Sequence, residues 1–444
     1  MTTDLTALTT SDRYRLRHAR LPASVVDPSL GLPADADGFI RADVLVTQGH
    51  ITAIAPVIEA DVPAIDLEGG QVWPACIELH THLDKAHTLT RAHNPHGTIL
   101  AAVEAVRKDR LANWSAADVE RRFDFSLRSA YAHGTAAIRT HIDSYPPQAP
   151  ISWPVFEKLR AHWSGRIELQ GVAMTMLSDY AGAAGVELAD LVAASNGILG
   201  GVTRLALPPQ EQTAERIAGC LDQLFRLAAE RGLDVDLHVD ETADLHPNTL
   251  KLVAQAVLRN AFRGRVVCGH CCSLALQTDA EARATIALVR EAALSIVTLP
   301  MVNLHLQGRR PGQTPRWRGV TLLRELAAAG VPVAAASDNS RDPMHPYGDF
   351  DPVEVFRETA KVCHLDLDAS EWLPLVTKSP ADIMRLPGRG RLAAGLAADL
   401  IVFRARSMSE LFARPHCGRT VLRRGRAIDS TLPDFRELDR PDAL

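Results

Sequence analysis

Residues 75–87 read ACIELHTHLDKAH. A mostly apolar run leads here to two histidines separated by one residue. The apolar run is typical of a buried strand in a parallel sheet. On a strand, residues two apart point to the same face, so His80 and His82 can reach one metal ion. Such a pair alone is also compatible with two surface histidines. A doubly wound open sheet would place a glycine-rich turn after its first strand, and residues 78–81 contain no glycine.

Strand-like and helix-like segments alternate after this stretch. Helical periodicity marks, for example, Ala214–Ala229, Asp279–Ala293 and Leu322–Ala329. The candidate strands are Val72–Leu79, Ala136–His141, Leu169–Thr175, Val202–Leu207, Val235–Val239, Arg265–His270, Ser295–Leu299 and Val331–Ser337. Eight strands alternating with helices over about 300 residues predict an α/β chain folded as a (β/α)8 TIM barrel.

Both ends of the chain carry further strand patterns. Arg41–Pro56 predicts two strands around the turn at residues 48–50, and Asp399–Phe403 and Thr420–Ile428 are also strand-like. We therefore expect a small β-sandwich domain built from both termini. The expected divisions are residues 1–70 for its N-terminal part, 71–385 for a metal-binding barrel and 386–444 for its C-terminal part.

The composition limits the class of protein. Of the 444 residues, 46% are hydrophobic and 23% charged, which is enough for a large core. A net charge of -5 argues against nucleic acid as a partner, and no apolar run approaches the ~18–20 residues of a membrane span. An odd count of seven cysteines and a polar start without a signal-peptide pattern predict a cytoplasmic location. A homo-oligomer is compatible with the sequence, but no interface is visible in it.

Other predicted strands end in residues that can bind a metal. His238 lies on the fifth strand with Glu241 just beyond it, His270 ends the sixth, and Asp338 follows the eighth. The carboxyl ends of barrel strands meet at the face where barrel enzymes act. Each residue alone is compatible with a structural role, such as a helix N-cap for Asp338. Their coincidence with the His80/His82 pair predicts a metal site.

These residues and their surroundings resemble the amidohydrolase superfamily, specifically its cytosine-deaminase-like branch. The similarity extends from about Val44 to Ile428. It is carried by AIRTHIDS (137–144), LHVDE (237–241), PMVNLHLQGR (300–309), the Asp338–Gly348 stretch, and the closing pattern formed by Ser379–Asp382 and Gly395–Ile401.

The resemblance implies one divalent metal ion, Zn²⁺ or Fe²⁺, bound by His80, His82, His238 and Asp338. His270 would hydrogen-bond the attacking water and the developing oxyanion. Binuclear relatives need a bridging lysine on the fourth strand, and residues 202–207 contain none. A bound metal lowers the pKa of water towards ~7, and Asp338 can accept the proton that is released. Glu241 can protonate the ring nitrogen and the leaving amine, although a solvated loop carboxylate is the alternative.

Four residues are candidates for substrate binding: Lys85, Met176, His305 and Asn339. Lys85 is also compatible with a solvated lysine or with filling the space of a second metal, and His305 with a packing role. Met176 takes the position where cytosine deaminases carry a glutamine that pairs with the ring. A thioether cannot replace that donor and acceptor, so we expect cytosine to be a poor substrate unless Met176 is simply a core residue.

The sequence therefore predicts a metal-dependent amidohydrolase. Its reaction would cleave an exocyclic C–N bond, deaminating a small cytosine-like, pterin, purine or triazine heterocycle. The alternative is release of an N-alkyl amine or opening of a cyclic amide in the same site. A non-catalytic binding subunit is disfavoured, because every inferred ligand and Glu241 are present.

Overall fold

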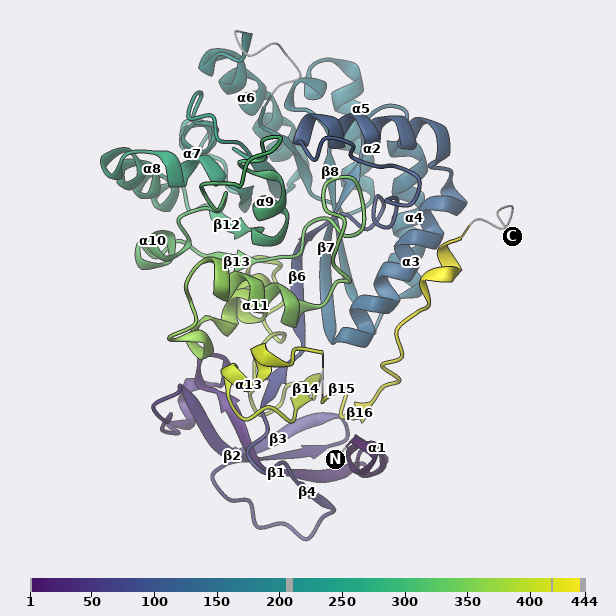
Figure 1. Ribbon diagram of the computed structural model, residues 1–444, viewed down its shortest axis with the longest axis vertical. Coiled ribbons are helices and arrows are strands. Elements are labelled where there is room, and N and C mark those ends of the chain that lie inside the picture. Colours follow the sequence, from purple (N-terminus) through teal and green to yellow (C-terminus); the bar gives the residue numbers. More distant parts are fainter. Residues whose placement is uncertain (1, 205–210, 417, 440–444) are drawn as a thin grey trace.

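The computed structural model describes residues 2–204, 211–416 and 418–439 (Figure 1). Parallel strands surrounded by helices form the main body, and two small sheets lie together at one end of it (Figure 1). Within the described ranges, no helix combines the length and apolar character that crossing a membrane requires. The cytoplasmic location and the homo-oligomer stay predictions.

The strands of the main body form two parallel sheets in the orders β6-β7-β8 and β13-β12-β11-β10-β9. Their bounds are β6 Cys76–Thr81, β7 Thr135–Asp143, β8 Glu168–Met174, β9 Leu199–Val202, β10 Val235–Val239, β11 Val266–His270, β12 Ser295–Thr298 and β13 Val333–Ala335. The prediction Val72–Leu79 is wrong as one strand, because Val72–Pro74 forms a separate strand, β5, that pairs with β14 (Leu400–Phe403). The prediction Val202–Leu207 begins where β9 ends, and residues 205–207 of it lie outside the described residues.

Isolated bridges join the two parallel sheets at both seams. Met176 bridges to Val202 at one seam, and Thr81 bridges to Asp338 at the other. At the second seam the carboxylate of Glu78 accepts hydrogen bonds from the backbone N–H groups of His80 and Ser337, each at 3.1 Å. The parallel strands therefore do not form the single continuous sheet that was predicted. β13 has only three residues, and the Glu78 side chain binds the backbone of Ser337 just beyond it.

Helices follow the strands and cover them (Figure 1). Their bounds are α2 Ile99–Asn113, α3 Ala116–His133, α4 Ala149–His162, α5 Ala183–Ala194, α6 Ala214–Arg231, α7 Thr249–Arg259, α8 Asp279–Glu291, α9 Pro300–Leu306, α10 Leu323–Ala328, α11 Pro352–Val362 and α12 Lys378–Ile383. Side-chain caps begin several of them, as Ser115 does for α3, and Gly134 ends α3 with a positive φ of 109°. The three helices predicted by periodicity are confirmed as α6, α8 and α10.

The two small sheets come from the two ends of the chain. The first has the order β3-β2-β1-β4, and the second has the order β16-β15-β14-β5. Their remaining bounds are β1 Arg13–Pro22, β2 Phe39–Thr47, β3 His50–Ala55, β4 Ala64–Asp66, β15 Arg419–Arg423 and β16 Arg426–Ala427. The sheets meet where the Tyr14 hydroxyl donates to the Gly425 carbonyl at 2.6 Å.

Sequence reasoning missed β1. Its pairing with β2 shifts register between Leu16 and Ala19, and His18 has a positive φ of 51°. Such a bulge breaks the alternation of inward and outward residues by which a strand is recognised. The division of the chain at residues 70 and 385 stays a prediction.

Candidate functional site

Four buried side chains converge at the carboxyl ends of the strands. They come from β6 (His80), β10 (His238), the last residue of β11 (His270) and the segment after β13 (Asp338). One nitrogen or oxygen of each lies within 4.8 Å of the others. None of these residues is more than 7% exposed. The structure thus brings together residues that are separated by up to 258 positions in the chain.

His82 joins this cluster from the residues that follow β6. Its Nε2 lies 3.1 Å from Oδ1 of Asp338 and 3.3 Å from Nε2 of His238. The Nε2 of His80 is 3.7 Å from the same Asp338 oxygen. All four sequence-predicted metal ligands therefore lie side by side, with His270 adjacent at 4.0 Å from Asp338 Oδ2.

The backbone at these strand ends is unusual. Asp240, His270 and Asp338 have positive φ angles of 47°, 68° and 64°. Non-glycine residues in this region cost about 1–3 kcal/mol each and concentrate at functional sites. Gly269 lies directly against the His80 ring, since a Cβ at this position would be 2.9 Å from His80 Cε1. The close approach explains why a glycine precedes His270.

The cluster has the chemistry of a metal site. Both ring nitrogens of His80, both carboxylate oxygens of Asp338 and Nε2 of His270 are buried, and none has a hydrogen-bond partner among the described residues. Burial holds the pKa of His80, His82 and His238 well below the ordinary value, so these rings are neutral. Neutral imidazoles and a carboxylate are ligands that suit Zn²⁺ or Fe²⁺. A divalent cation would satisfy one ring nitrogen of His80 and the carboxylate of Asp338, and the residues fit it.

Glu241 lies beside the cluster, in the loop after β10. Its Oε1 is 3.6 Å from Nδ1 of His270, and its side chain is 23% exposed. Desolvation raises the pKa of this carboxyl to about 8 despite the opposing charge of Lys85. A raised pKa favours the protonated form that a general acid needs.

Asn303 also contacts the cluster, and sequence reasoning missed it. Its Nδ2 lies 2.9 Å from Nδ1 of His270, and the residue is fully buried. An amide NH₂ can only donate, so Nδ1 of His270 accepts and the neutral ring carries its proton on Nε2. Asn303 lies within the PMVNLHLQGR segment, but nothing in that local pattern distinguishes it from His305.

Lys85 is buried rather than solvated. Its Nζ lies 3.2 Å from Oδ1 of Asp143, which also pairs with Arg110 at 2.9 Å. Burial opposes the charge, but the carboxylates of Asp143, Asp342 and Asp84 raise the pKa of Lys85 above its ordinary value. The amine is therefore a fixed cation close to the cluster.

The other three predicted substrate contacts lie at the ends of different elements. Met176 follows β8 and its sulfur accepts from Tyr145 at 3.9 Å, and Asn339 donates to Asp342 at 2.6 Å. His305 lies on α9, with its ring 5.6 Å from that of His345. Among the described residues, no hydrogen bond or ring contact joins these three side chains to the metal-site cluster.

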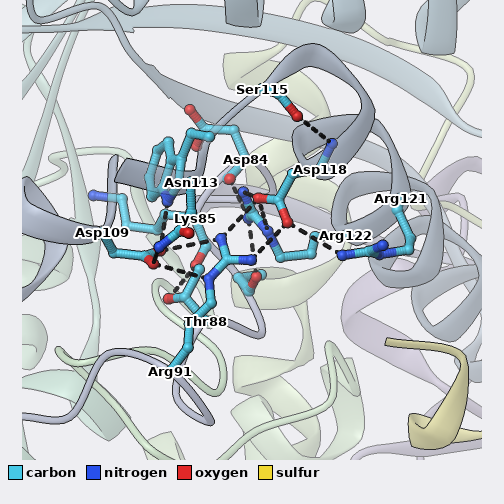
Figure 2. A network of polar contacts seen from close by, with 12 residues as sticks. Asp84, Lys85, Thr88, Arg91, Asp109, Asn113, Ser115, Asp118, Arg121 and Arg122 are labelled. Carbon is cyan, nitrogen blue, oxygen red and sulfur yellow. Dashed lines mark hydrogen bonds and ion pairs between the residues drawn. The ribbon is translucent and has the colours of Figure 1, made fainter. Parts of the chain in front are cut away.

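A network of ion pairs supports the residues that follow β6 (Figure 2). Arg91 binds Asp109 at 2.9 Å and Asp118 at 2.6 Å. Arg122 binds Asp118 at 2.8 Å and donates to the carbonyl oxygens of Asp84 and Ala86. Through this network α2 and α3 are tied to the chain segment that begins at His82.

Comparison with known proteins agrees with this site. The model of the amidohydrolase family matches residues 127–428. A pterin deaminase of Rhizobium rhizogenes (strain K84 / ATCC BAA-868) is 51% identical over 96% of this chain and 96% of its own length. N-isopropylammelide isopropyl amidohydrolase of Pseudomonas sp. (strain ADP) is 26% identical over 82% of this chain and 88% of its own.

A solved structure shows the same likeness. The 5-methylcytosine deaminase of Klebsiella pneumoniae superposes with a TM-score of 0.78 at 25% identity, covering 93% of this chain and 97% of its own. The predicted resemblance is confirmed, and with it an enzyme that acts on C–N bonds. The likeness to solved structures of this kind implies a TIM-barrel fold, and the chain belongs to the amidohydrolase family.

Proposed function

We propose that this metal-dependent amidohydrolase deaminates a pterin, replacing the exocyclic amino group by a carbonyl and releasing ammonia. The observation that carries the substrate class is the 51% identity with a pterin deaminase over 96% of both chains. The buried cluster of histidines and Asp338 supports the reaction type. A non-catalytic binding subunit is not supported, because the inferred ligands and Glu241 are all present.

One divalent ion, Zn²⁺ or Fe²⁺, would be held by His80, His82, His238 and Asp338. When bound, it supplies Lewis-acid activation of the attacking water. Residues 202–207 contain no lysine that could bridge a second ion, which supports a single metal.

Two carboxyl groups would move the protons. Asp338 accepts one proton from water as the new C–O bond forms, and Glu241 gives its proton to the adjacent ring nitrogen. Asp338 then passes its proton to the amino group, the C–N bond breaks, and ammonia leaves. The remaining hydroxyl proton returns to Glu241 as the carbonyl forms, so both groups recover their starting state.

Two further side chains would act on the substrate without moving protons. His270 carries its proton on Nε2, because Asn303 occupies Nδ1, and this N–H can donate to the oxygen on which charge develops. Lys85, held by Asp143, can donate to a ring carbonyl. Met176, His305 and Asn339 are proposed to contact the ring and its substituents.

The architecture is proposed to be a closed barrel carrying a β-sandwich. The bridges at the β8–β9 and β6–β13 seams support closure. The contact between Tyr14 and Gly425 supports a sandwich made from both chain ends, divided from the barrel near residues 70 and 385.

The test is a product assay with Zn²⁺- and Fe²⁺-loaded protein on pterin, guanine, cytosine and N-isopropylammelide. We expect ammonia from pterin, with kcat/KM in the ~10⁴–10⁸ M⁻¹s⁻¹ range of efficient enzymes, and no activity in metal-free protein. The 26% relative favours a second candidate, N-alkyl amine release. Isopropylamine from N-isopropylammelide without turnover of pterin would establish that candidate and reject ours.

A further inference from the structure

The C-terminal segment reaches the region of the active site from the opposite end of the molecule. After β16 the chain runs along α3 and forms a short 3-10 helix, η7, Phe435–Leu438 (Figure 1). The side chain of Asp434 caps this turn, and Glu437 pairs with Arg128 of α3 at 2.6 Å. The segment is therefore docked on α3 by specific contacts.

Phe435 packs on side chains from three separate parts of the chain. Its ring stacks on Phe125 of α3 at a centroid distance of 5.5 Å and lies 6.0 Å from the ring of His87. The guanidinium of Arg341 lies over the Phe435 ring at 4.1 Å, a distance typical of cation–π contacts. One aromatic ring thus bridges α3, the segment after β6 and the segment after β13.

The two segments that Phe435 bridges both carry proposed metal ligands. We name residues 82–89 the histidine loop and residues 338–342 the aspartate loop. The two loops are joined by backbone hydrogen bonds from His87 N to Ser340 O at 3.1 Å and from Leu89 N to Arg341 O at 2.9 Å. Phe435 covers this junction from outside.

His87 lies at this junction in an apolar enclosure. It is only 6% exposed, and neither ring nitrogen has a hydrogen-bond partner among the described residues. Its ring is enclosed by Phe125, Phe350 and Phe435. An unpaired polar ring gains by moving into water, so it stays in place only while the aromatic cover excludes water.

We propose that Phe435 is a positioning residue, through which the C-terminal segment holds the histidine loop and the aspartate loop together. Removing its ring would expose His87 and free Arg341. The two loops would then separate more readily, and the relative placement of His82 and Asp338 would loosen. This inference goes beyond the choice of substrate, and its catalytic consequence rests on the metal site proposed above.

The test compares Phe435→Ala with Phe435→Tyr, which keeps the ring and can direct its hydroxyl to solvent because Phe435 is 43% exposed. Leu432→Ala is the matched control, since Leu432 is 45% exposed on the same segment. Hydrogen exchange of peptides spanning both loops is measured in the full-length protein. The time that a chelator needs to remove the metal and kcat on the accepted substrate are measured alongside it.

For Phe435→Ala we expect amide exchange in both loops to be about tenfold faster, because the opening that limits exchange becomes easier. Metal removal should be faster, and kcat should be lower by about tenfold or more, since small misplacements of catalytic groups are costly. Phe435→Tyr should restore all three, and Leu432→Ala should behave like the parent.

Parental exchange rates in both loops of Phe435→Ala would overturn the proposal, whatever the activity. If that variant does not fold, Phe435→Leu keeps an apolar side chain without the ring, and the same criterion applies to it. A parent that binds no metal would reject the proposed function, while the exchange measurement would still decide the role of Phe435.

Discussion

Two carboxylates on neighbouring helices offer a controlled test of which ion pairs stabilise this protein. Asp118, near the start of α3, binds Arg91, Arg121 and Arg122, and its side chain is 10% exposed (Figure 2). Glu104 of α2 binds Arg107, with 45% and 50% of the two side chains exposed. We expect Asp118→Asn to destabilise the protein far more than Glu104→Gln.

The magnitude follows from burial and from the pKa of Asp118. Burial raises this pKa, but the hydrogen bonds and charges of Arg91 and Arg122 outweigh it and lower the value from 3.8 to about 2. At 1.36 kcal/mol per pKa unit this corresponds to about 2 kcal/mol. The variant also leaves Arg122, which is 2% exposed, with a weakened partner, and an unpaired buried cation raises the cost. The expected loss is about 2–4 kcal/mol.

The pKa of Glu104 is also lowered to about 2, yet its pair with Arg107 lies in water and is screened. Exposed pairs contribute little to the free energy of unfolding, so Glu104→Gln should leave it almost unchanged. The two variants thus separate the effect of burial from the effect of a shifted pKa.

Urea unfolding of the metal-loaded proteins at several pH values provides the measurement. The folded-state pKa of Asp118 lies below its unfolded value, so its contribution is fully present above about pH 4 and is lost as the pH falls through about 2. The gap between parent and Asp118→Asn should therefore narrow below about pH 4. Equal losses in the two variants at pH 7, or a loss below about 1 kcal/mol in Asp118→Asn, would refute the reasoning.

Further predictions concern the site itself. Glu241→Gln should keep the metal and lose ~10²–10⁴-fold in kcat; turnover within a few-fold of the parent removes Glu241 from the mechanism. His82→Ala should lose metal and activity together, and elemental analysis of the active parent should find one ion per chain, not two. Gly269→Ala should weaken metal binding about 10-fold or more, measured by metal titration, because the new Cβ would lie 2.9 Å from His80; parental affinity would contradict this. Cytosine should be a poor substrate because Met176 cannot pair with its amide edge; a kcat/KM for cytosine above that of every larger ring would reverse this view.

The metal-site cluster shows how far sequence patterns reach. The spacing of His80 and His82 and the positions of His238, His270 and Asp338 at predicted strand ends are local features of the sequence. Parallel strands bring their carboxyl ends to one face, so the fold class alone predicted that these residues would meet. The structure places them within a few ångströms of one another, while their catalytic roles stay predictions.

Other elements of the site carried no such local signal. Asn303 of α9 contacts His270. Asp143, at the end of β7, forms an ion pair with Lys85, which follows β6. Phe435, near the end of the chain, packs on the junction of the histidine loop and the aspartate loop. β1 was missed because a bulge interrupts its pattern. β5 was predicted as one strand with β6, because its partner β14 lies more than 300 residues away and leaves no local signal.

The sequence by itself thus determined the class of fold and the residues that can bind a metal, because periodicity and strand-end position are properties of short segments. The family followed from the resemblance of its motifs. Only the tertiary structure decided how burial and neighbours shift the protonation of the site residues, and which side chains hold those residues in place. The reason is physical: the pKa of Glu241, the tautomer of His270 and the placement of Lys85 depend on burial and on partners distant in the chain. Those partners are brought together only by packing.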